Sequence, residues 1–164
     1  MQPREIKMMS FALAIAYGLH QLATLVWVGG MFFAHMALRP AAQEVVKPRD
    51  RLLLMSGVFR RFFPWVWVAI LVLWGSGLWV FLAVLQAKVG LHVHAMMGAA
   101  MVMTAVFVYL YAFPYRKLKT AIQEEEWPRA AAGLGLIRRL IAINLALGLF
   151  AALAGSAGRY VLAG

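Results

Sequence analysis

The sequence predicts an all-α integral membrane protein, built as a four-helix bundle. Hydrophobic residues make up 64% of the 164 residues and charged residues only 13%, whereas a soluble domain of this size carries about 25% charged residues. The apolar residues come in long blocks rather than in the rhythm of an amphipathic helix or strand. Four blocks each exceed the roughly 18 apolar residues that mark a membrane-spanning helix.

The four expected spans form one transmembrane domain, residues 1–164. The first apolar window, 8–38, is the longest. At 1.5 Å per residue it would extend about 46 Å, more than the roughly 30 Å of the hydrocarbon core. This helix must therefore tilt or project from the membrane. The other windows are 62–87, 91–115 and 140–158.

The later windows contain features typical of helix packing in membranes. Window 62–87 contains the small residues of "WGSG", and window 140–158 contains Gly148 and Gly155. Small residues allow two helices to approach closely. In the last window we also expect Asn144 to form a hydrogen bond with another helix, because a polar group inside a span needs a partner.

The distribution of positive charge predicts the topology. The net charge is +10, but the cations lie beside the spans, so we interpret them as topology signals and exclude nucleic-acid binding. The segments between windows one and two and between windows three and four carry twelve of the sixteen Lys and Arg residues. The positive-inside rule places both segments in the cytoplasm and both termini outside. Cysteine is absent, which excludes thiolate metal ligands.

Histidines at the outer ends of two spans are the main candidate site. His20 lies in the first window at a depth comparable with His92 and His94, while His35 lies roughly 22 Å further along the same helix. Ionisable groups within spans are costly and usually functional. These imidazoles have no carboxylate partner within the spans, and a metal or a haem iron would supply the missing partner. We expect such a site on His20 and His94.

The neighbours of these histidines leave several alternatives open. His92 and His94 are about 200° apart on a helix, and we favour His94 as the one that points into the bundle. His92 is then a second ligand, a hydrogen-bond partner or a water-facing residue. Met97, one turn from His94, offers a thioether that suits Cu(I), although Met is also ordinary packing. Arg159 could hold a haem propionate or an anionic substrate, or reach the headgroups.

The segments "LHQLATLVWVGGMFFAHMALRPA", "FRRFFPWVWVAIL", "LHVHAMMG" and "IRRLIAINLALGLF" together resemble the CopD-like family of bacterial inner-membrane proteins. That resemblance implies copper handling in the inner membrane, with a periplasmic copper protein as a partner. A weaker resemblance, to the membrane-type protoporphyrinogen oxidases, implies haem b. It places the histidines of that family on His20 and His94, but Met96 stands where that family has a lysine.

Three functional hypotheses follow. The first is copper handling at the periplasmic face, with His20, His92, His94 and Met97 as ligands. The second is a haem b cytochrome or oxidoreductase with His20 and His94 as axial ligands, Arg159 on a propionate, and a quinone or another electron-transfer partner. The third is a non-catalytic membrane subunit. We favour copper handling, and we expect a homodimer in the lipid bilayer.

Overall fold

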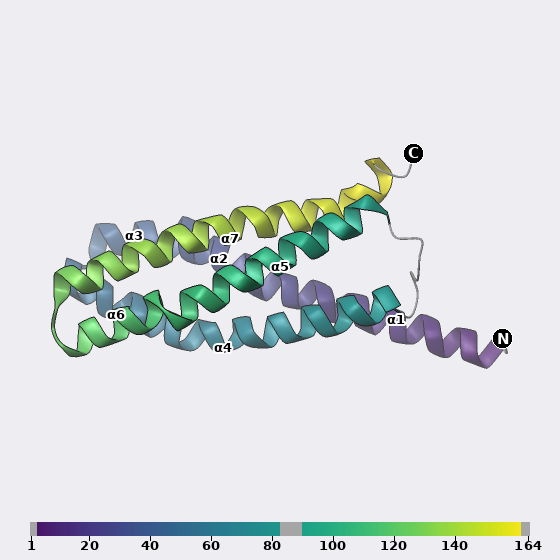
Figure 1. Cartoon of the computed structure of the whole chain (residues 1–164), viewed down its shortest axis with the longest axis horizontal. Helices are drawn as coiled ribbons and strands as arrows, with labels where there is room; N and C mark the ends of the chain where they lie inside the picture. Colours follow the sequence, from purple (N-terminus) through teal and green to yellow (C-terminus); the bar gives the residue numbers. More distant parts are fainter. Residues whose placement is uncertain (1–2, 83–89, 162–164) are drawn as a thin grey trace.

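The computed structural model describes residues 3–82 and 90–161, except the side chains of residues 3, 6 and 158–161. All regular structure within these residues is helical. Four of the helical stretches are long and apolar enough to cross a membrane, which confirms the predicted all-α fold (Figure 1). They are Lys7–Val45, Pro48–Val80, Leu91–Gln123 and Trp127–Ala157.

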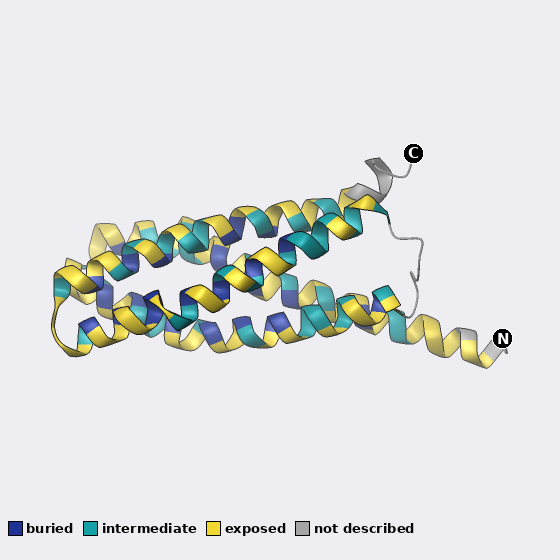
Figure 2. Ribbon diagram, viewed as in Figure 1, coloured by how far each residue is buried: buried dark blue, intermediate teal, exposed yellow. Residues whose placement is uncertain are grey.

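The first span is one long helix with two π-helical turns. Its elements in chain order are α1 (Pro3–Thr24), η1 (Leu25–Gly29), α2 (Gly30–Phe33), η2 (Ala34–Leu38) and α3 (Arg39–Val45). A π-helical turn is wider than an α-helical one and shifts the side chains that follow it around the axis. The start of α1 extends past the other helices and is exposed (Figures 1 and 2). The first helix thus projects, as its length predicted.

The second and fourth spans begin well before their apolar windows, and the third window is divided between two helices. They are α4 (Pro48–Val80), α5 (Leu91–Ala112), α6 (Pro114–Gln123) and α7 (Trp127–Val161). The basic segments that precede windows 62–87 and 140–158 are already helical, and they pack against α6. The last part of the second window, 83–87, lies outside the described residues.

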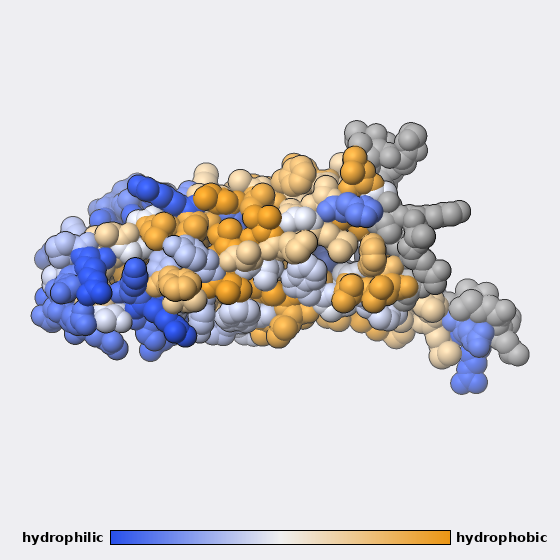
Figure 3. All heavy atoms as spheres, in the orientation of Figure 1, coloured by the Kyte–Doolittle hydropathy of each residue, from blue (hydrophilic) through white to orange (hydrophobic). Residues whose placement is uncertain are grey.

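The two ends of the bundle differ in chemistry. We call the end with the α3–α4 and α6–α7 connections the loop end, and the opposite end, where α1 begins and α7 finishes, the terminal end (Figure 1). Hydrophilic residues gather at the loop end and hydrophobic residues cover the middle (Figure 3). At the loop end, α6 buries Leu118 and Ala121 completely and packs along the first turns of α7.

Two helix pairs make up the bundle, and aromatic rings join them. The first span packs along α4, and α5 packs along α7. Between the pairs, rings of α4 meet rings of α5 and α6 with centroids 4.9 to 6.5 Å apart. We call this set the aromatic zipper. It consists of Phe59, Phe63 and Trp67 on α4, and Phe107, Tyr111 and Tyr115 on α5 and α6.

Polar and close contacts complete the packing. The Asn144 side-chain nitrogen donates to the Met103 carbonyl oxygen at 3.1 Å, which confirms the predicted interhelical bond. The Trp74 indole nitrogen donates to the Thr104 hydroxyl at 3.2 Å and links α4 to α5. A Cβ added at Gly148 would lie 2.8 Å from the Val28 side chain. A side chain here would have to displace Val28, so glycine lets α7 pass close to η1.

Removal of the central ring of the zipper should destabilise the fold. Phe63 is 3% exposed and contacts rings on both α5 and α6. Phe63→Ala should lower the free energy of unfolding by about 3 kcal/mol or more, the range for a buried phenylalanine that leaves a cavity. Trp65, on the same helix and 62% exposed, is the matched control. Unfolding by SDS titration in mild detergent measures both, and equal losses would contradict the packing assignment.

Candidate metal site and its surroundings

His20 lies on α1, half-buried, and its ring turns toward α4. Its Nδ1 is 2.9 Å from the hydroxyl oxygen of Ser76. Ser76 is the third residue of "WGSG", and a Cβ at the following Gly77 would lie 3.5 Å from the imidazole Cε1. The small residues of α4 therefore give the imidazole room beside the helix backbone.

The hydrogen bonds of Ser76 determine the orientation and the tautomer of His20. A serine hydroxyl has one hydrogen to donate. The hydroxyl oxygen of Ser76 lies 2.6 Å from the carbonyl oxygen of Val72 and donates its hydrogen to it. Its oxygen consequently accepts the N–H of His20 Nδ1. We infer from this network that Nε2 carries the free lone pair. Metal-binding histidines commonly have this arrangement, in which one nitrogen is held by a neighbour and the other binds the ion.

The structure places His92, rather than His94, on the inward face of α5. The buried stripe of this helix, followed backward in steps of three and four residues, reaches Met96 and then His92. His94 is exposed, and its Nδ1 lies 3.4 Å from the Gly90 carbonyl oxygen of its own first turn. The expected orientation of the two rings is therefore reversed. The stripe itself consists of Ala99, Met103, Phe107 and Leu110.

The His92 ring folds against the start of its own helix. A Cβ at Gly90 would lie 2.6 Å from the His92 Cε1. The Nδ1 of His92 is buried and has no hydrogen-bond partner among the described residues. An imidazole nitrogen in this state still has an unused donor or acceptor. His92 is thus available to a ligand or to a water molecule.

Met97 lies on the face of α5 that is directed toward α4. The Trp74–Thr104 hydrogen bond turns the Thr104 side of α5 toward α4. Met97 precedes Thr104 by seven residues, close to two helical turns, so both lie on the same face. His94 is one turn before Met97 on the adjoining face. A thioether and an exposed imidazole therefore follow one another along α5 toward the terminal end.

The donors are divided between the two helix pairs. His20 belongs to the pair formed by the first span and α4, while His92, His94 and Met97 lie on α5, and the pairs draw apart toward the terminal end (Figure 1). Within the described part of the chain, no group of three or more His, Cys, Asp or Glu could hold a metal. The side chain of Arg159, in the last turn of α7, lies outside the described residues.

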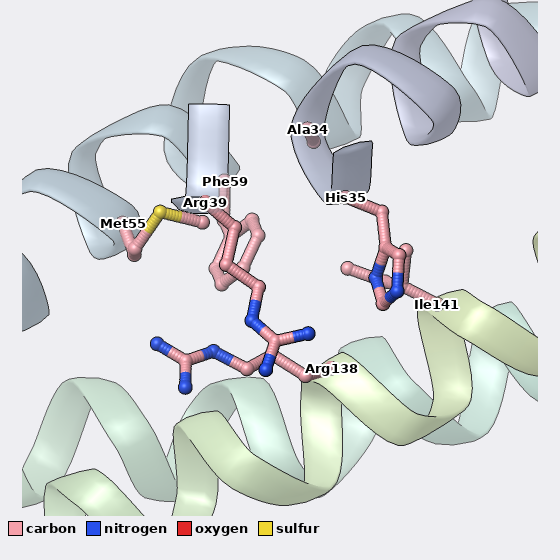
Figure 4. Close-up of a pocket in the computed structure, with 7 residues that line it drawn as sticks. All are labelled: Ala34, His35, Arg39, Met55, Phe59, Arg138 and Ile141. Carbon is pink, nitrogen blue, oxygen red and sulfur yellow. The ribbon is translucent and has the colours of Figure 1, made fainter. Parts of the chain in front are cut away.

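Sequence reasoning missed a cluster of two arginines and one histidine at the loop end. His35 on η2, Arg39 on α3 and Arg138 on α7 line one small cavity together (Figure 4). Both arginines had been interpreted only as topology signals. Helical periodicity could have revealed the position of Arg138. It lies four residues after Leu134, which is buried, so both residues lie on the inward face of α7. The next residue, Arg139, is exposed.

One comparison with known proteins gives a match. A family model described as copper resistance protein D matches residues 56–157, which is more than half of the chain. No curated protein and no solved structure matches. The matched region includes Ser76, His92, His94 and Met97, whereas His20 lies before it. With its four membrane-spanning helices, the chain is a multi-pass membrane protein that belongs to the copper resistance protein D (CopD) family.

Proposed function

We propose that this protein handles copper by binding Cu(I) at its terminal end, with the imidazole of His20 as the principal ligand. The observation that carries the proposal is the hydrogen bond between His20 Nδ1 and Ser76. It holds the ring in place and leaves Nε2 free to bind an ion. Met97 on α5 supplies a thioether, and either His92 or His94 supplies a further imidazole, because these two residues lie on opposite sides of the helix.

The donor types suit Cu(I) better than a hard cation. Imidazole nitrogen and thioether sulfur are ligands for soft and borderline ions, whereas Mg²⁺ and Ca²⁺ take carboxylate and carbonyl oxygens. By helical phase, Met97 lies on the same face of α5 as Thr104, which contacts Trp74 of α4. In this proposal the copper ion is cargo, and it joins the two helix pairs where they draw apart.

The proposed topology places this site in the periplasmic half of the bacterial inner membrane. The loop end, with most of the Lys and Arg residues, is cytoplasmic by the positive-inside rule. The terminal end is then accessible to a periplasmic copper protein. A homodimer remains a prediction.

Loss of His20 should abolish tight copper binding. We expect the purified protein in mild detergent to retain Cu(I) in competition with a chromogenic Cu(I) chelator, and His20→Ala to lose affinity by about a hundredfold. His35→Ala is the matched control, because His35 is on the same span but at the loop end. Equal retention by wild type and His20→Ala would refute the site. A visible Soret band that disappears in both His20→Ala and His94→Ala would instead support haem b.

Loss of the Ser76 hydroxyl should weaken copper binding without removing a ligand. In Ser76→Ala the His20 ring loses the acceptor for its Nδ1 hydrogen, and such losses typically lower metal affinity by about ten- to a hundredfold. Ser76→Thr keeps a hydroxyl and should restore most of the affinity. The same chelator competition measures both variants. An affinity of Ser76→Ala equal to wild type would show that the hydrogen bond does not orient the ligand.

A further inference from the structure

Two partly buried arginines at the loop end line one cavity, and the ion pairs of the described residues include neither of them. Arg39 and Arg138 line the same cavity as His35, and their side chains meet at its edge in the close-up view (Figure 4). The Nε atom of each arginine is buried and has no hydrogen-bond partner among the described residues. An unpaired buried Nε–H group is costly. The two Nε–H groups therefore favour an acceptor that the described side chains do not supply.

The local charge is positive and uncompensated. Arg39 and Arg51 both act on Arg138 with like charge. The ion pairs of the described residues lie nearer the α6–α7 turn, where Arg49 meets Glu125 and Arg129 meets two glutamates. Guanidinium groups bind phosphate oxygens through short, charge-assisted hydrogen bonds. An anion with oxygen acceptors would supply the missing counter-charge.

The cavity between the arginines is small, and it adjoins a larger apolar one. Its volume of about 10 Å³ admits one water-sized group, which matches a single phosphate oxygen. The walls formed by Ala34, Phe59 and Ile141 also line a second cavity of about 370 Å³. That volume is within the range of binding sites for small ligands.

The larger cavity reaches the surface that faces the lipid. Its walls include the rings of Phe62, Phe63 and Phe107 in the interior. At its rim stands Phe33, which is 60% exposed. An apolar chain could thus enter from the bilayer between the first span and α4. The anion-binding groups and the apolar space lie end to end.

We propose that the loop end binds one anionic phospholipid. A phosphate oxygen of its headgroup accepts hydrogen bonds from Arg39 and Arg138, with His35 beside it, and one acyl chain fills the apolar cavity. The depth of the cluster agrees with this occupant, because Arg39 follows the first apolar window and Arg138 precedes the fourth. Basic side chains at such positions lie at headgroup level. A free phosphate would leave the apolar cavity without an occupant.

Native mass spectrometry of the full chain can test the proposal. The detergent-purified protein is mixed with equal amounts of phosphatidylglycerol and phosphatidylcholine, and the retained lipid is identified. We expect one phosphatidylglycerol to be retained in preference to phosphatidylcholine. The double variant Arg39→Gln/Arg138→Gln should retain it about tenfold less or worse, because two charge-assisted bonds are lost. Arg139→Gln is the matched control and should retain it as wild type does.

Two further measurements separate the possible sources of the anion and guard against misfolding. In the wild-type protein, phosphatidylglycerol should raise the melting temperature more than phosphatidylcholine does. This measurement does not depend on whether the variants fold. Inorganic phosphate should be much less effective. Ala34→Phe, which fills the junction of the two cavities, should also lower retention. Equal retention of both lipids by wild type, equal losses in Arg139→Gln and the double variant, or an equal effect of inorganic phosphate would overturn the proposal.

Discussion

The aromatic zipper determines how the two helix pairs sit together. Its rings recur every fourth residue on both partners, at Phe59, Phe63 and Trp67 on one side and at Phe107, Tyr111 and Tyr115 on the other. Lipid tails are as apolar as these side chains, so packing and ring geometry, rather than exclusion of water, favour the contact within the membrane. Large rings also hold the backbones of α4 and α5 apart. The zipper therefore joins the pairs and spaces them at the same time.

The zipper occupies the loop half of the bundle and leaves the terminal half less tightly joined. Beyond Trp67, the Trp74–Thr104 hydrogen bond links α4 to α5, and the pairs then draw apart (Figure 1). His20 on one pair and Met97 on the other lie in this region. Regions with few buried contacts open at low free energy. Under the proposed function, a soft ion bound between the pairs would enter and leave here without disturbing the zipper.

Hydropathy predicted the four spans and the interhelical bond of Asn144, because both follow from the cost of polar groups in lipid. The orientation of His92 and His94 was predicted wrongly. When both faces of a helix are apolar, periodicity does not identify the inward face, and only the large side chains from Met103 to Leu110 reveal it. The contact between His20 and Ser76 depends on the register of α1 against α4, which composition and spacing do not contain.

The two arginines of "IRRL" show how neighbouring cations acquire different tasks. Successive residues differ by about 100° around a helix, so Arg139 is exposed while Arg138 meets Arg39 inside. A charge count treats both as topology signals. The pair places positive charge beside the cavity at the loop end, and Coulomb repulsion in a medium of low dielectric constant opposes a further cation there. A bound phosphodiester would offset only one of the two positive charges, so under both proposals the pair would still raise the barrier that Cu⁺ meets at the loop end.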